Sequence, residues 1–265
     1  MNGRGPTGIR APNRADECAV EMAAQLREKH DGQVMLISVA PPEADEILEM
    51  YVGLGAGGFV RIWEDGLADV DQYGVALTLS RAAARFSPDL ILCGERSVGD
   101  YGTGLIGPSL AERLGWPFVG RVSSFQVGVG AAIAHRLVER GDKLTIQTPL
   151  PVVLSVSREA NEPRYPALAK IRRAWRETLD LAALGLTRDD LAAAHSPARA
   201  VGWAAARPRP KKLFAPPSTA SAADRLRMVS GGGPARKAQD QFVEAPPERS
   251  AELILAVLKQ EKVIT

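Results

Sequence analysis

Residues 89–117 read DLILCGERSVGDYGTGLIGPSLAERLGWP, which is an apolar strand, a glycine-rich loop and a helix in succession. The strand is predicted over 89–93 and the loop is Gly94–Gly104. The helix is predicted over 104–114, because Gly115-Trp116-Pro117 would end it. A loop that leaves a strand and opens a helix places backbone N–H groups at the carboxyl edge of a parallel sheet, where α/β proteins bind ligands. This stretch therefore predicts an α/β fold with a candidate ligand site.

The segment upstream repeats the alternation of strand and helix. Strands are predicted over 34–39 and 59–63, and helices over 14–29, 43–54 and 71–86, from the spacing of their apolar residues. Short strands alternating with helices of about a dozen residues indicate right-handed crossovers onto a parallel sheet.

Downstream of Pro117 the pattern becomes one of strands only. Residues 118–127, 131–139 and 143–157 are strand-like, and glycine-containing turns separate them at 128–130 and 140–142. This arrangement predicts two hairpins added to the sheet.

The C-terminal part has a different composition. From about residue 176 prolines and small residues accumulate, and no core segment is predicted until a last helix over about 248–261. We therefore divide the chain into a nucleotide-binding-like α/β domain over 1–195 and an extended arm over 196–265. Such an arm is expected to be ordered only on the surface of a partner subunit.

The composition excludes several classes of protein. With 265 residues, 45% of them hydrophobic, the chain can bury a substantial core, and its net charge of +2 is too small to imply nucleic-acid binding. It has neither an apolar run of about 18 residues nor a signal-peptide pattern, so it is predicted not to be an integral membrane protein. Cys18 and Cys93 form no CxxC pair, which argues against zinc or a disulfide framework and fits a cytoplasmic location.

Patterns that resemble functional motifs have ordinary structural explanations. Gly53, Gly55 and Gly58 satisfy G-x-G-x-x-G, but they leave a helix and enter a strand, which indicates a helix C-cap rather than a dinucleotide fingerprint. Arg140-Gly141-Asp142 is predicted to be a hairpin turn. The histidines, His30, His135 and His195, are too scattered for a metal site or a catalytic dyad. Because no nucleophile or acid–base constellation occurs either, no catalytic residue is predicted and the chain is not expected to be an enzyme.

Two residues of the Gly94–Gly104 loop could contact a nucleotide. Thr103 could cap the following helix or donate its hydroxyl to a phosphate, and Asp100 could accept a hydrogen bond from a ribose or an adenine amine. An ordinary strand-to-helix loop with an N-cap would contain the same residue types. Spacing alone leaves both interpretations open.

A second segment is more specific. Residues 157–168 read SREANEPRYPAL and follow an apolar strand, and their Asn-Glu-Pro-Arg-Tyr sequence resembles the signature of electron-transfer flavoprotein β subunits. The similarity extends from about residue 13 to 262, and the other segments that carry it are 92–96, 107–117, 170–173, 180–185 and 213–217.

The resemblance implies a Rossmann-like α/β domain and a C-terminal arm that reaches around an α subunit. In such a heterodimer the α subunit holds FAD, and the β subunit holds AMP or, in the electron-bifurcating branch, a second FAD. The implied partners are a flavin-dependent dehydrogenase and an electron acceptor. A stand-alone adenine-nucleotide-binding module is the rival from another class, but it would need neither the arm nor the signature.

The resemblance also assigns site residues. The implied cofactor-binding residues are Cys93, Gly94, Asp100, Gly102, Thr103, Gly104, Leu105 and Arg136. The implied partner-docking residues are Asn161, Glu162, Arg164, Tyr165, Leu168, Ile171 and Arg172. Leu168 is the residue expected to insert into the dehydrogenase, as an exposed anchor with a polar rim. The alternative for Leu168 is a core position on a short helix.

The chain departs from the family pattern at several positions. Gly102 stands where a second acidic residue is usual, Leu105 where a glutamine is usual, and Leu137 where an acidic residue normally follows the arginine. Members also begin with a β-strand, and this sequence has no apolar strand before Arg14. These departures bear on the nucleotide site more than on the fold or the partner.

Overall fold

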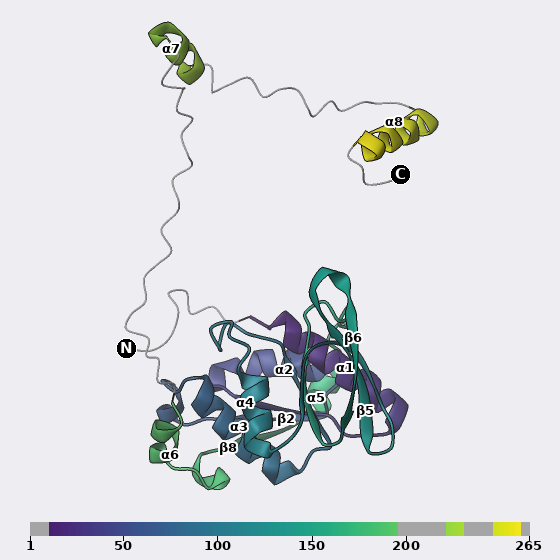
Figure 1. The fold of residues 1–265 in the computed structure, drawn as a ribbon. Coiled ribbons are helices and arrows are strands. Elements are labelled where there is room, and N and C mark those ends of the chain that lie inside the picture. The colour runs from purple at the N-terminus through teal and green to yellow at the C-terminus, as the bar shows by residue number, and fades with distance from the viewer. Residues whose placement is uncertain (1–10, 196–220, 231–245, 261–265) are drawn as a thin grey trace. The chain divides into compact units, whose positions relative to one another are not determined.

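The computed structural model describes residues 11–195, 221–230 and 246–260. Its contacts divide the chain into one compact unit up to Ala204 and a second from Ala205 onward. The first unit contains an α/β fold, and the described part of the second contains two helices (Figure 1). The domain boundary predicted at residue 195 stays a prediction, because residues 196–220 lie outside the described part.

The elements of the first unit follow the predicted order closely. The strands are β1 (Met35–Val39), β2 (Gly58–Ile62), β3 (Leu90–Gly94), β4 (Phe118–Val127), β5 (Ala131–Leu137), β6 (Lys143–Pro149), β7 (Val152–Val156) and β8 (Trp175–Leu179). The α-helices are α1 (Arg14–His30), α2 (Asp45–Leu54), α3 (Gln72–Phe86), α4 (Ile106–Leu114), α5 (Leu168–Arg173) and α6 (Arg188–Ala193). Short 3-10 turns lie at η1 (Pro42–Ala44), η2 (Asp65–Leu67), η3 (Glu139–Gly141) and η4 (Ala182–Leu184).

The strands form two sheets, and both contain parallel pairs, which confirms the Rossmann-like α/β fold with added hairpins. One is parallel, in the order β1-β2-β8, and the other is mixed, in the order β3-β7-β4-β5-β6. No ladder pairs β1 with β3 in the described part of the chain, and every residue of these two strands is only half-buried.

Both predicted hairpins are confirmed. The pairs β4–β5 and β5–β6 are antiparallel, and the Arg140-Gly141-Asp142 segment forms the turn between β5 and β6. The predicted strand over 143–157 is divided at Leu150-Pro151, because proline cannot donate to a ladder. Its second half, β7, lies between β3 and β4 with all five residues buried.

The G-x-G-x-x-G glycines lie at the end of α2 and the start of β2, which confirms the C-cap interpretation. Helix α2 ends at Leu54 with Gly55 as its C-cap, and β2 begins at Gly58. A Cβ on Gly53 would lie 2.7 Å from the Pro166 Cβ, and one on Gly58 would lie 2.3 Å from the Trp175 carbonyl oxygen. The segment after β7 therefore rests directly against the end of α2.

Residues 175–193 belong to the core, which corrects the expectation that no core follows about residue 176. Strand β8 extends the first sheet, and η4 and α6 follow it. The leucines of this segment are buried in a cluster with β2 and α3, and they are Leu179, Leu181, Leu184, Leu186 and Leu191. They escaped prediction because they are distributed over a strand, a turn and a single helical turn, so no one periodicity relates them.

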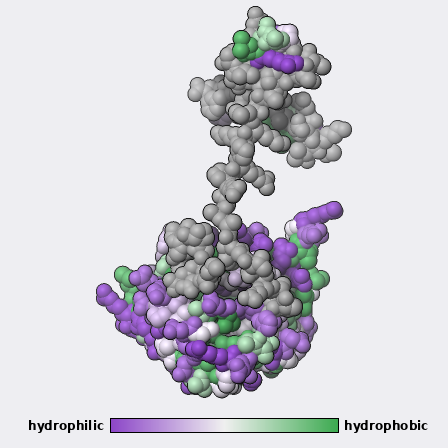
Figure 2. All heavy atoms as spheres, turned by 90° about the vertical axis from the view of Figure 1, so that its left-hand side faces the viewer, coloured by the Kyte–Doolittle hydropathy of each residue, from purple (hydrophilic) through white to green (hydrophobic). Residues whose placement is uncertain are grey.

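The second unit contains α7 (Ala222–Ser230) and α8 (Pro247–Gln260). Helix α8 confirms the predicted terminal helix, whereas α7 was not predicted. The side chains of Leu253, Ile254 and Leu255 on α8 are exposed, so the packing of the arm on a partner stays a prediction. Figure 2 shows one face of the first unit, on which hydrophilic side chains predominate. No described helix is long and apolar enough to cross a membrane.

We expect Leu191→Ala to lower the free energy of unfolding by about 2–5 kcal/mol, through lost transfer energy and the cavity left behind. Leu191 is only 5% exposed and packs in the cluster that joins α6 to the sheet. Urea denaturation of the full chain would measure the change. The matched control is Leu144→Ala on β6, where the leucine is half exposed and the change should stay within about 0.5 kcal/mol. Equal effects of the two substitutions would contradict the placement of residues 175–193 in the core.

Candidate functional site

The loop between β3 and α4 is organised by the buried carboxylate of Asp100. Its Oδ1 accepts hydrogen bonds from the backbone N–H groups of Ser97 (2.9 Å) and Gly102 (3.0 Å), and its Oδ2 accepts one from Gly104 (2.9 Å). The carboxylate therefore acts as an internal template for the loop. Because three backbone N–H groups already donate to this carboxylate, it has little remaining capacity to accept hydrogen bonds from a ligand.

Thr103 is also engaged within the loop. Its hydroxyl donates to the Asp100 carbonyl oxygen at 2.7 Å and accepts from the Leu105 N–H at 3.4 Å. The amides of Gly102 and Thr103 donate to the carbonyl oxygens of Ser97 and Asp100 as well. The first donors of α4 with no acceptor in the described part of the chain are those of Ile106 and Gly107.

Cys93 and Gly94 lie at the carboxyl end of β3, next to the start of α1. The Gly94 N–H donates to Asp16 Oδ1 at 2.6 Å, and the Asn13 side chain donates to Asp16 Oδ2 at 2.7 Å. Burial raises the pKa of the Asp16 carboxyl, and burial beside Asp16 and Asp100 raises the pKa of the Cys93 thiol to about 12. Cys93 is therefore a neutral packing group, and a Cβ on Gly107 would lie 3.1 Å from its sulfur.

Arg136 is separated from the other implied cofactor residues. It is exposed on β5, in register with Val122, and two strands, β7 and β4, lie between β5 and β3. With strands about 4.8 Å apart, it lies roughly 14 Å across the sheet from the Gly94–Gly104 loop. The structure thus brings together the implied cofactor residues from Cys93 to Leu105 but not Arg136.

A cavity of about 640 Å³ opens beside this loop. Its walls come from the start of α1, from the loop and from the segment after β7, and its lining residues are Asn13, Arg14, Ala15, Glu95, Arg96, Ser97, Val98, Tyr101, Gly102 and Arg158. The lining includes three arginines, of which Arg14 is paired with Glu162 at 3.2 Å, and one glutamate. A cationic cavity of this volume at the carboxyl end of a strand suits an anionic small molecule such as a nucleotide.

The segment after β7 is held to α1 and α2 at several points. The Asn161 side chain donates to the Cys18 carbonyl oxygen at 3.0 Å, the Ala167 N–H donates to the Gly53 carbonyl oxygen at 2.9 Å, and Lys170 Nζ lies 3.4 Å from the Leu54 carbonyl oxygen. These bonds fix the segment at both ends.

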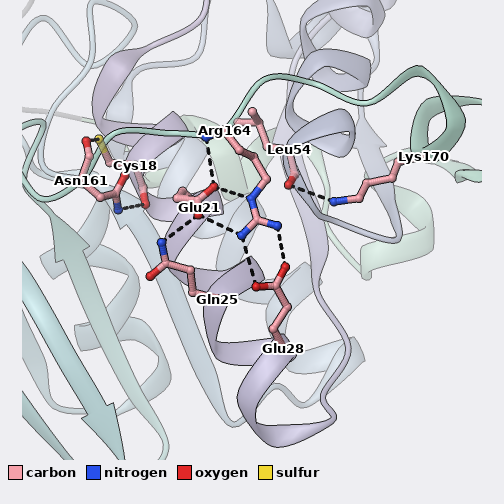
Figure 3. Close-up of polar contacts among 8 residues, drawn as sticks. All are labelled: Cys18, Glu21, Gln25, Glu28, Leu54, Asn161, Arg164 and Lys170. Atoms are coloured by element: carbon pink, nitrogen blue, oxygen red, sulfur yellow. Dashed lines mark hydrogen bonds and ion pairs between the residues drawn. The ribbon is translucent and has the colours of Figure 1, made fainter.

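Arg164 makes the central attachment (Figure 3). Its Nε donates to Glu21 Oε2 at 2.8 Å, its Nη2 to Glu21 Oε1 at 2.9 Å, and its Nη1 to Glu28 Oε1 at 2.5 Å. Burial acts to raise the pKa of the Glu21 carboxyl, but hydrogen bonds from Arg164 and Gln25 outweigh it and hold that pKa below its ordinary value. The hydrogen bond from Arg164 lowers the pKa of Glu28 in the same way.

The implied docking residues thus fall into two groups. Asn161 and Arg164 are directed toward α1, and Ile171 is half-buried, so these side chains hold the segment in place. The outward group is Glu162, Tyr165, Leu168 and Arg172. Tyr165 is 97% exposed and Leu168 is 70% exposed, so Leu168 is not the core residue that the alternative interpretation required.

Two glutamates and an aspartate of α1 were missed by the sequence interpretation. Glu21 and Glu28 lie seven residues apart, which is about two helical turns and the same face, and Asp16 lies at the start of the helix. The only signal in the sequence was that Glu21 lies in the apolar stripe of the helix, which indicates a buried carboxylate in need of a cation. The sequence does not show that Arg164 is that cation.

No group of three or more His, Cys, Asp or Glu side chains suited to a metal ion occurs among the residues that the structure describes. The fold and the site together define an α/β protein of the Rossmann-like kind, with a cationic cavity after β3 and a fixed, outward-facing loop after β7.

Comparison with known proteins is consistent with this class. A family model described as the electron transfer flavoprotein domain matches residues 9–184. The chain is 36% identical over 182 residues to the electron transfer flavoprotein subunit beta of Bacillus subtilis (strain 168), covering 67% of this chain and 70% of that protein. It is 32% identical over 261 residues to the protein of that name from Chromohalobacter salexigens, covering 95% and 89%. It is 28% identical over 171 residues to the caffeyl-CoA reductase-Etf complex subunit CarD of Acetobacterium woodii, covering 64% of each. The chain belongs to the electron transfer flavoprotein β-subunit family.

The Glu21–Arg164 pair gives a pH prediction. Because the folded state lowers the pKa of Glu21, the pair stabilises the fold above the ordinary carboxyl pKa of 4.5 and this contribution is lost as the pH falls through the lowered value. We expect Glu21→Gln to cost up to about 3 kcal/mol at pH 7, less than a fully buried pair because Arg164 is partly exposed. Urea titrations from pH 7 to pH 3 should show the difference from wild type shrinking toward the acid end. A difference independent of pH would show that packing, not charge, is what the substitution removes.

Proposed function

We propose that the chain is the β subunit of a heterodimeric electron-transfer flavoprotein that carries electrons from a flavin-dependent dehydrogenase to an acceptor. FAD, held mainly by the α subunit, supplies the redox chemistry, and this chain shapes the environment of the flavin and docks the dehydrogenase. The observation that carries the proposal is the outward placement of Tyr165 and Leu168 on a loop that the rest of the fold holds fixed, in a chain of this family. In this role the chain needs no catalytic residues of its own.

The cationic cavity after β3 is the proposed nucleotide site. Arg96 and Arg158 line the cavity, and their guanidinium groups would contact the phosphates of a nucleotide. The amides from Gly102 to Leu105 and the Asp100 carboxylate shape the loop instead, because they bind one another. AMP would fill a structural role there.

A subunit with its own FAD, as in electron-bifurcating complexes, is the second candidate. The cavity volume of about 640 Å³ lies within the range of small-molecule and cofactor sites, so it is compatible with either AMP or FAD. A location in the cytoplasm is proposed for either candidate, because Cys18 and Cys93 are both free thiols in the structure.

We expect the purified chain alone to be colourless and the heterodimer with its α subunit to carry one FAD. Acid extraction of the heterodimer should release an adenylate, and Arg96→Met with Arg158→Met should lower its content several-fold while the FAD remains. Absorbance spectra and chromatography of the extract would measure both. A stoichiometric flavin on the isolated chain would overturn this form of the proposal and support the subunit with its own FAD.

We expect Leu168→Ala to weaken electron transfer from the dehydrogenase by about 10- to 100-fold in second-order rate, as for an anchor worth roughly 1–3 kcal/mol. The melting temperature should stay unchanged, because the side chain is mostly exposed. Stopped-flow reduction of the heterodimer's flavin and thermal melts would give the two quantities.

The matched control is Leu144→Ala, an exposed leucine on β6, which should leave both quantities unchanged. Wild-type reduction rates in the Leu168→Ala heterodimer would remove the segment after β7 from the docking surface.

A further inference from the structure

One guanidinium holds the proposed docking loop to two carboxylates of a single helix. Arg164 donates to both oxygens of Glu21 and, through Nη1 and Nη2, to Glu28. The backbone N–H of Arg164 also donates to Glu21 Oε2, at 3.2 Å. The main chain and the side chain of this residue are therefore both fixed against α1.

The two carboxylates differ in environment. Glu21 is 4% exposed, and a buried carboxylate is costly unless its oxygens are satisfied. Its Oε1 accepts from Arg164 and from Gln25, and its Oε2 accepts two donors of Arg164. Glu28 is exposed, and it orients the opposite edge of the same guanidinium.

Arg164 directly precedes the exposed residues of the loop, so its contacts with α1 affect how those residues are oriented. Tyr165, the next residue, is almost fully exposed, and Leu168 follows three residues later. Pro166 and Ala167 between them rest on Gly53. The direction in which Tyr165 and Leu168 point is therefore set by contacts on either side of them.

We propose that Glu21 and Glu28 are positioning residues for partner docking: through Arg164 they hold Tyr165 and Leu168 in the orientation that the dehydrogenase binds. This proposal rests on the proposed function. A loop already in its bound conformation does not lose conformational entropy when the partner binds, so its affinity is higher than that of a loose loop with the same side chains. Asn161 and Arg164 then act on docking through the shape of the loop rather than by touching the partner.

A substitution at Glu28 can test the positioning role without a large change in the stability of the fold. A solvent-exposed carboxylate contributes little to the free energy of unfolding, whereas removal of the buried Glu21 carboxylate also weakens the fold. A substitution at Glu28 therefore loosens the loop while leaving the domain folded.

The test compares Glu28→Lys with Glu112→Lys in the full heterodimer. Both substitutions make the same charge change at an exposed helix position, and Glu112 lies on α4 rather than on α1. The measurements are hydrogen exchange of the Arg164 and Ala167 amides, which donate to Glu21 and Gly53, the melting temperature, and reduction of the flavin by the dehydrogenase that reduces the wild-type heterodimer. High ionic strength removes long-range charge effects from the rates.

We expect Glu28→Lys to accelerate exchange at these amides and to lower the second-order rate of flavin reduction about tenfold, the cost of ordering two or three side chains on binding. The limiting rate at saturating dehydrogenase and the melting temperature should stay as in the wild type. Glu112→Lys should change none of these.

Leu168→Ala distinguishes failure of the positioning role from failure of the proposed docking function. If Leu168→Ala lowers the second-order rate and Glu28→Lys behaves like Glu112→Lys, the positioning role is wrong and the docking function stands. If Leu168→Ala has no effect either, the proposed function fails. Unchanged exchange of the Arg164 and Ala167 amides in Glu28→Lys would also overturn the positioning role.

Discussion

The carboxylate of Glu21 is buried on the inner face of α1, and a buried carboxylate needs a cation and hydrogen-bond donors to offset its desolvation. Arg164 supplies both, and together with Asn161 it joins the helix before β1 to the segment after β7. The Ala167 N–H, which donates to the Gly53 carbonyl oxygen, holds the other side of Tyr165. The burial of Glu21 is thus one of the constraints under which Tyr165 and Leu168 remain exposed.

The same segment also borders the cavity after β3. Strands β3 and β7 are parallel neighbours, so the loops that follow them emerge at the same edge of the sheet. Arg158 leaves β7 into the cavity, and six residues later Arg164 turns to α1. Arg14 lines this cavity and also bonds Glu162 at 3.2 Å on the docking segment. An anion in the cavity would compete with Glu162 for Arg14, which gives a physical route by which nucleotide content could affect the docking segment.

Sequence patterns predicted the secondary-structure elements better than they predicted the orientation and contacts of individual side chains. The strands and helices up to residue 156 follow from apolar periodicity and from glycine and proline positions, and the structure confirms them within a few residues. The family signature singled out residues 157–168 as the segment proposed for docking, but periodicity could not show that Arg164 turns inward while Tyr165 turns outward. That division depends on Glu21 and Glu28, which lie about 140 residues earlier in the chain. Likewise the role of Asp100 as a template for its own loop follows from the turn geometry around Gly102 and Gly104, which have positive φ angles, and not from the residue type alone.

The amides of the loop after β3 donate hydrogen bonds within the loop itself, so a nucleotide would add little to the order of the loop. Where loop amides point at a phosphate and have no other acceptor, the empty loop carries unpaired donors and gains order on binding. Here Asp100 and Thr103 already pair the amides from Gly102 to Leu105. The loop therefore has its shape without a ligand, and the binding energy of the proposed nucleotide would come from the cavity arginines. Nucleotide affinity in this chain should accordingly depend on salt and on Arg96 and Arg158 more than on Thr103, because screened charge contacts, not a cradle of amides, would hold the phosphate.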